Sequence, residues 1–159
     1  MKIPHGKHSV TPYVAAKGAE RFLAFVEAAF AAEPARKFLN PDGTIGHGEV
    51  TIGNSVVMTF DAAPHWPDIP ALLSVYVDDV DETFARAVGA GATVVTEPFT
   101  SRVVGDRGGR LRDPVGNIWW VQTHLSDPDP GAFGDPDEAR IMHAAQRSFA
   151  DEMGRRTNV

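Results

Sequence analysis

His47 and Glu49 are the residues of this 159-residue chain whose types and spacing best suit chemistry, because they stand two positions apart in the alternating stretch Ile45 to Ile52. Side chains two apart on a strand point to the same face of a sheet. An imidazole and a carboxylate on one face can move protons beside a substrate carbonyl, with or without a divalent metal. The same spacing is typical of a hydrogen-bonded polar pair without a catalytic role, and the residues leave both interpretations open.

A second group of candidate side chains follows from the same alternation. We expect Trp119 to lie in the core, which turns its neighbour Trp120 to the opposite face. No predicted helix covers that face, so Trp120 is expected to stack on an aromatic ligand. Two arginines on it could face the His47 and Glu49 pair, either stabilising an oxyanion or forming an internal ion-pair network. The predicted ligand-binding side chains are Tyr13, Tyr76, Arg110, Arg112, Trp120, Gln122 and His124.

Composition excludes several classes of protein. A hydrophobic content of 43% is sufficient for a real core, and the absence of cysteine excludes disulfides, thiolate zinc sites and thiol enzymes. A net charge of −6 argues against a nucleic-acid partner, which would require a basic surface. No apolar run has the length of a signal peptide or a membrane span, so we expect a cytoplasmic protein with no membrane partner.

Hydrophobic periodicity predicts the elements that would position these residues. The expected elements are a strand at 9–15, a helix at 18–32, a hairpin of 45–52 with 56–60, a strand at 72–77, a helix at 80–89, a strand at 93–97, a turn at 105–109 and a hairpin of 110–113 with 118–124. Alternation in the first hairpin places Val56, Met58 and Phe60 under the first helix.

The two halves have the same order of elements, strand, helix and three strands, which predicts an internal repeat. Leu23 and Phe84 lie at matching helix positions, and Gly53 and Gly116 open the last strand of each half. We expect a first module at 8–62, a second at 71–126, and a linker with a C-terminal helix at 127–159. That helix presents the apolar stripe Ile141, Ala145, Phe149 and Met153, which must cover either its own chain or a partner subunit.

Several phrases in both halves resemble one superfamily. They include Thr-Pro-Tyr-Val near the start, Val-Tyr-Val-Asp-Asp-Val-Asp in the middle and, most specifically, the turn Asp113 to Asn117 followed closely by tryptophan. Over residues 8–126 the chain resembles the glyoxalase/bleomycin-resistance superfamily, also called the vicinal oxygen chelate fold. The resemblance implies an α+β fold of two βαβββ modules that form a cup-shaped open sheet, usually in a homodimer.

Metal-dependent members of that superfamily place ligands on the first and last strand of each module. Those positions fall on Thr11, Val57, Leu72 and Trp120 here, and none of them suits a divalent ion. The resemblance therefore implies a protein without metal or cofactor that binds a small aromatic or conjugated molecule, like the superfamily's drug-sequestering resistance proteins. The alternative is a lyase or isomerase that uses His47 and Glu49 for acid and base chemistry, with or without a divalent metal. If a metal were bound, His124 would be its third ligand.

Overall fold

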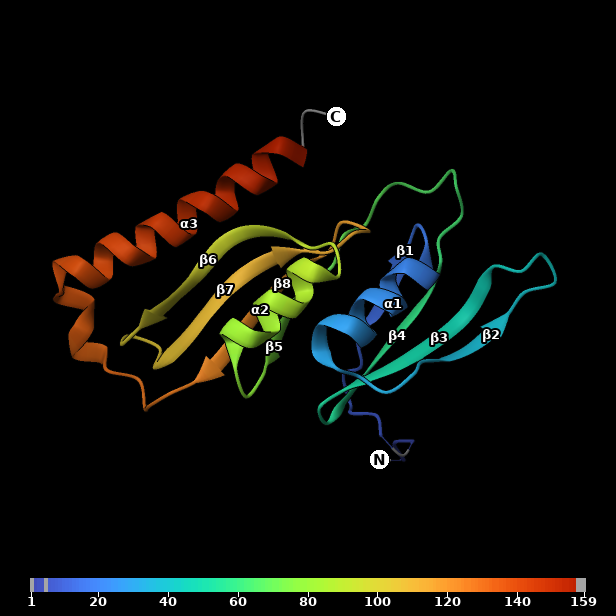
Figure 1. Ribbon diagram of the computed structural model, residues 1–159, viewed down its shortest axis with the longest axis horizontal. Coiled ribbons are helices and arrows are strands. Elements are labelled where there is room, and N and C mark those ends of the chain that lie inside the picture. The colour runs from blue at the N-terminus through green and yellow to red at the C-terminus, as the bar shows by residue number, and fades with distance from the viewer. Residues whose placement is uncertain (1, 5, 157–159) are drawn as a thin grey trace.

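Two four-stranded sheets, each with one helix, form the body of the protein (Figure 1). The computed structural model describes residues 2–4 and 6–156. Module one contains β1 (Tyr13–Ala16), α1 (Ala19–Phe30), β2 (Arg36–Leu39), β3 (Ile45–Ile52) and β4 (Ser55–Asp61). Module two contains β5 (Leu72–Tyr76), α2 (Val80–Gly89), β6 (Thr93–Ser101), β7 (Asp106–Arg112) and β8 (Ile118–His124), and is followed by η1 (Pro130–Gly134) and α3 (Pro136–Arg156). The predicted α+β fold of two βαβββ modules with a C-terminal helix is confirmed.

Both modules have the same strand order. The sheets run β1-β4-β3-β2 and β5-β8-β7-β6, with the first strand parallel to the last and the other neighbours antiparallel. The first helix of each module covers one face of its sheet. We call the opposite face the cup face, and it is the face on which the candidate side chains were expected.

Each helix approaches its sheet closely over one glycine. A Cβ on Gly48 would lie 3.0 Å from Leu23 Cδ1 of α1, and a Cβ on Gly109 would lie 2.6 Å from Phe84 Cζ of α2. The interval from Gly48 to Gly109 in the sequence equals the interval from Leu23 to Phe84. The internal repeat thus includes the contact that sets the distance between helix and sheet.

Trp119 of β8 joins the two modules. Its indole is 1% exposed and packs against three rings of α1, with centroid distances of 4.9 Å to Phe30, 6.1 Å to Phe22 and 6.4 Å to Phe25. Its Nε1 donates to the Asp113 carboxylate over 3.0 Å. The core of module one is therefore completed by a side chain of module two.

Asp113 also closes the turn that the resemblance singled out. Its carboxylate accepts hydrogen bonds from the backbone N–H groups of Val115 and Asn117, both at 2.9 Å, and from the Asn117 amide at 2.8 Å. A side chain that satisfies several donors in one turn holds β7 and β8 in register. The sequence of this turn is thus explained by the position that it gives to Trp119.

Helix α3 packs on its own chain, against β6 of module two (Figure 1). Ser148 shares a hydrogen bond of 2.7 Å with Thr96, and the Ser101 hydroxyl donates to Glu138 over 3.1 Å. Ala145 is buried, whereas Met153 is exposed. The apolar stripe is thereby covered within the chain only in part, and the homodimer stays a prediction of the resemblance. No helix within 2–4 and 6–156 is long and apolar enough to cross a membrane.

The structure corrects the expected orientation of β4. Val57 and Thr59 face α1, while Met58 and Phe60 lie on the cup face. The register explains this, because Glu49 is directly opposite Met58 and residues opposite each other on neighbouring strands share a face. The set that faces α1, Ser55, Val57, Thr59 and Asp61, is the more polar one, so alternation of hydrophobicity predicts the wrong face.

The predicted turn at 105–109 is also wrong, since four of its five residues begin β7. Glycine in a strand often marks the close approach of another element. Gly109 lies directly under α2, and Gly108 leaves room for Trp120 and Gln122, whose side chains a Cβ there would contact at 3.3 and 2.8 Å.

We predict that Trp119→Ala lowers the free energy of unfolding by about 3–5 kcal/mol, as large buried aromatic side chains do. Urea denaturation followed by circular dichroism measures the loss. The control is Phe133→Ala, which removes a ring that is 74% exposed and should change stability by less than about 0.5 kcal/mol. Equal losses in the two variants would contradict the role given to Trp119.

Candidate functional site

Aromatic rings gather on the cup face of module one. Tyr13 lies edge-on to Phe60 at 5.2 Å and to His47 at 5.8 Å, Phe38 lies 6.2 Å from His47, and Phe60 lies 6.0 Å from Trp66. Tyr13 is 52% exposed, Phe38 65% and Trp66 42%. We call these five residues, Tyr13, Phe38, His47, Phe60 and Trp66, the aromatic face.

A polar network holds the centre of the aromatic face. His47 Nε2 lies 2.9 Å from Glu49 Oε1, and the Tyr13 hydroxyl lies 3.2 Å from His47 Nδ1. With Glu49 ionised, Nε2 donates to the carboxylate and Nδ1 accepts the proton of Tyr13. Both ring nitrogens are thus engaged, which fixes the orientation of the imidazole.

Glu49 is surrounded by donors. Lys7 and Arg36 donate to its two carboxylate oxygens, in addition to His47. The hydrogen bond from Lys7 contributes most, followed by that from His47, and together with the nearby positive charges they lower the pKa of Glu49 to about 2. A general base works best with a pKa near the working pH. In this network the Glu49 carboxylate orients the imidazole of His47 through the hydrogen bond from Nε2.

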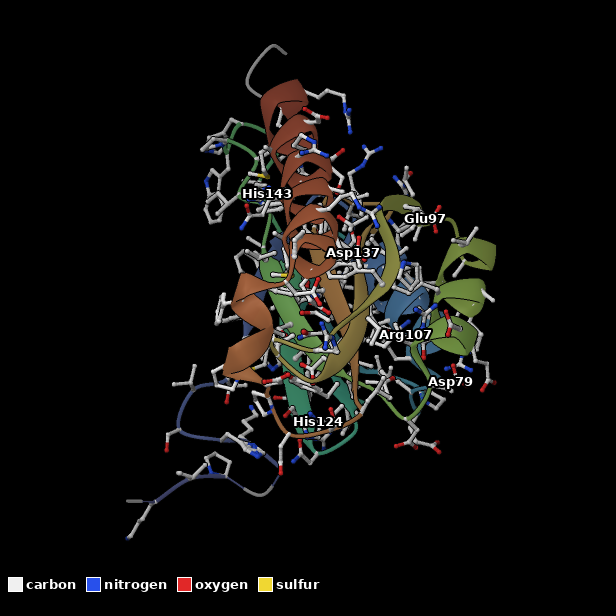
Figure 2. The ribbon with its side chains drawn as sticks, turned by 90° about the vertical axis from the view of Figure 1, so that its left-hand side faces the viewer. Asp79, Glu97, Arg107, His124, Asp137 and His143 are labelled. Atoms are coloured by element: carbon white, nitrogen blue, oxygen red, sulfur yellow. The ribbon has the colours of Figure 1, made fainter. Side chains whose placement is uncertain are left out.

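Two of the predicted residues in module two meet at a residue that the sequence analysis missed. The Tyr76 hydroxyl donates to Asp106 Oδ2 over 2.9 Å, and His124 Nδ1 lies 2.8 Å from Asp106 Oδ1. The hydrogen bond to Asp106 raises the pKa of Tyr76, because phenolate would face a carboxylate. In Figure 2, His124 lies near the bottom of the view, whereas the C-terminal end of α3 lies at the top. Nearby, the Gln122 amide donates to the Ser74 hydroxyl over 2.8 Å.

Helix α3 covers the other predicted residues of module two. The Arg110 guanidinium lies 4.4 Å from the ring centre of Trp120 and 5.1 Å from that of Phe149, and it donates to the Ala145 carbonyl over 3.1 Å. Burial lowers the pKa of Arg110. The expectation that no helix covers Trp120 is thus wrong, because the indole and Phe149 enclose a buried cation.

Arg112 is engaged with the same helix, since its Nε lies 3.3 Å from a carboxylate oxygen of Glu152 in α3. Arg110 and Arg112 therefore have partners in α3, while His47 and Glu49 have partners in module one. Within one chain, the structure does not assemble the predicted residues into a single polar site.

The donor set does not fit a divalent metal. Val57 is buried under α1, so the residue of β4 that occupies the last-strand position on the cup face is Met58, whose thioether is a poor ligand for such an ion. His124 is bonded to Asp106 and is not grouped with His47 and Glu49. Within the part of the chain that the structure describes, no three His, Asp or Glu side chains are arranged to hold an ion.

Three residues of the aromatic face, Phe38, Phe60 and Trp66, could not be predicted as site residues from the sequence. Phe60 was assigned to the wrong face, and Trp66 lies in a proline-rich connector without periodicity. Composition was the signal that could have indicated an exposed Trp66, because a lone tryptophan between prolines has no regular element to bury it.

A family model supports the resemblance. Residues 7–121 match the Glyoxalase/Bleomycin resistance protein/Dioxygenase superfamily. The chain belongs to this superfamily. A relative in Mycobacterium bovis, uncharacterized protein Mb0911c, is 31% identical over 122 residues, which cover 70% of this chain and 80% of the relative.

Two solved structures show the same fold. TioX from Micromonospora sp. ML1 is 23% identical with a TM-score of 0.56, and the match covers 77% of this chain and all of TioX. The fosfomycin resistance protein FosX from Mesorhizobium loti is 15% identical with a TM-score of 0.54, covering 74% of this chain and 92% of FosX. At these identities the likeness establishes the fold alone.

We predict that Glu49→Gln lowers the free energy of unfolding at pH 7 by about 1–2 kcal/mol, because charge-assisted hydrogen bonds are lost. Since the folded pKa is about 2 and the ordinary value is 4.5, the ionised carboxylate stabilises the fold above pH 4.5. This contribution disappears as the pH falls toward 2, so the two proteins should converge there. Urea denaturation across this range measures the difference.

The control for this prediction is Glu20→Gln, which removes an exposed carboxylate paired with Lys37. Exposed ion pairs contribute little to the free energy of unfolding, so this variant should differ little from the wild type. A pH dependence that is equally weak in the wild type and in Glu49→Gln would contradict the network.

Proposed function

We propose that this protein binds a small aromatic or conjugated compound on the aromatic face of module one, without a metal or a cofactor, and so sequesters it. The observation that carries the proposal is the group of exposed rings in edge contact, since flat ligands stack on such rings. The chain belongs to a superfamily that includes bleomycin resistance proteins, and this membership supports sequestration as the form of function.

The polar network favours binding over acid and base catalysis. His47 has no free ring nitrogen, because Tyr13 and Glu49 engage both, and Glu49 is held ionised by Lys7 and Arg36. A lyase or isomerase at this position would require one of these groups to accept a proton from substrate. The network instead keeps the rings of Tyr13 and His47 in place, which lowers the side-chain entropy that the protein loses when a ligand binds.

We predict that planar probes bind and quench the fluorescence of Trp66. Suitable probes are the anion 8-anilinonaphthalene-1-sulfonate and the cation proflavine, whose comparison also reports the charge that the site prefers. Tyr13→Leu should weaken binding roughly 5- to 100-fold, using the magnitude known for bases that stack on aromatic side chains. Tyr13→Phe should retain most of the affinity because it keeps the ring.

The control outside the site is Phe133→Leu, which changes a ring on η1 that is more exposed than that of Tyr13. An equal loss of affinity in Phe133→Leu and Tyr13→Leu would show that the probe binds exposed rings without selectivity, and would contradict the proposal.

We predict that Zn²⁺, Ni²⁺, Mn²⁺ and Fe²⁺ leave the melting temperature nearly unchanged. The positions expected for ligands carry Thr11, Val57, Leu72 and Trp120, and Met58 takes the place of Val57 on the cup face. Binding at 100 times Kd would instead add roughly 2.7 kcal/mol of stability. Differential scanning fluorimetry measures the shift. A saturable, ion-specific rise that is lost in His47→Ala would contradict a metal-independent protein.

A further inference from the structure

A cavity lies between the two modules and away from the aromatic face. It has a volume of about 640 Å³, which is within the range of small-molecule sites. Its walls are residues 52–57 of module one with 8 and 10–12 beside them, and residues 73–76 of β5 opposite. Val57, Leu73, Val75 and Trp119 give it an apolar lining, and no residue of the aromatic face takes part.

One wall of this cavity is the open edge of a sheet. β5 is the first strand in the order β5-β8-β7-β6, and no second strand pairs with it among the described residues. The Ala71 carbonyl accepts from Ile118 of β8, and the Val77 N–H donates to Gln122 of β8. The backbone groups of one residue point to one side of a parallel strand, and successive residues alternate. Residues 71, 73, 75 and 77 thus bond to β8.

It follows that the intervening residues, Ser74 and Tyr76, direct their backbone N–H and C=O groups to the open edge. Along this wall the cavity therefore presents donors and acceptors that repeat every second residue, about 7 Å apart. An extended peptide has the same repeat, and its backbone forms such bonds when it adds a strand to a sheet edge.

We propose that this cavity binds an extended peptide, or the peptide-like part of a larger compound, as an added strand along β5. The backbone bonds to Ser74 and Tyr76 would fix its direction, and its apolar side chains would contact Val57, Leu73 and Val75. The partner is a short ligand rather than a second sheet, because residues 52–57 close the far side of the cavity. This site is independent of the aromatic face and of the function proposed for it.

The first experiment uses a short blocked peptide of alternating valine and threonine with a fluorescein label, and its fully N-methylated counterpart. The first peptide should bind saturably in fluorescence anisotropy, whereas N-methylation removes every backbone donor and should abolish binding. The proposal is overturned if the two peptides bind equally, or if neither binds at concentrations up to about 1 mM.

The second experiment changes the edge itself. Ser74→Pro removes the N–H that faces the cavity, and proline is tolerated where that group lies on an open edge. Ser74→Ala is the matched control, since both variants lose the hydroxyl that Gln122 binds. We expect Ser74→Pro to bind the peptide about tenfold more weakly than Ser74→Ala, whereas equal affinities overturn the proposal.

If Ser74→Pro does not fold, hydrogen exchange of backbone amides in the wild-type protein still tests where the peptide binds. The peptide should slow exchange of the Ser74 and Tyr76 amides and leave those of Leu73 and Val75, already bonded to β8, nearly unchanged. Unchanged exchange at Ser74 and Tyr76 in the presence of bound peptide would show that it binds elsewhere, which overturns the assignment to β5. Tyr13→Leu should leave peptide binding unaffected, so failure of this site and failure of the aromatic face are separate outcomes.

Discussion

The arrangement of the two modules depends on the burial of one indole. Trp119 extends from β8 into the rings of α1, and its N–H reaches the Asp113 carboxylate, so it is both packed and hydrogen-bonded. A buried indole with an unpaired N–H would be costly, and Asp113 removes that cost. The turn from Asp113 to Asn117 can thus be understood as the support of this contact, which in turn positions β5 opposite module one.

The two modules repeat one architecture but present different cup faces. In module two, α3 lies over the sheet, and Arg110 is enclosed between Trp120 and Phe149. Module one has no such helix, and its rings stay accessible. A buried guanidinium between two rings stabilises the docking of α3, whereas exposed rings suit binding. Helix α3 thus covers the cup face of module two and leaves that of module one exposed.

Much of the fold could be predicted from the sequence because its periodicities are strong. Alternation placed Trp119 and Trp120 correctly, since Gln122 and His124 mark one face of β8 as polar. It failed for β4, where the more apolar set, Val56, Met58 and Phe60, lies on the cup face and only the pairing with β3 decides the orientation.

The candidate site was less predictable because its contacts are distant in sequence. His47 and Glu49 form the expected pair, yet Lys7 lies far from Glu49 in the chain and decides its pKa. Asp106 stands among glycines that indicated a turn. The contact of Phe149 with Arg110 depends on where α3 packs, which no local pattern encodes.

The position of Trp119 has a consequence for the newly made chain. The rings of α1 are complete once residue 30 has been synthesised, but the indole that covers them follows about 90 residues later. At ordinary rates of translation this interval lasts roughly 5–20 s. During that time Phe22, Phe25 and Phe30 have only module one to shield them, so the nascent chain passes through a period in which chaperones can recognise it.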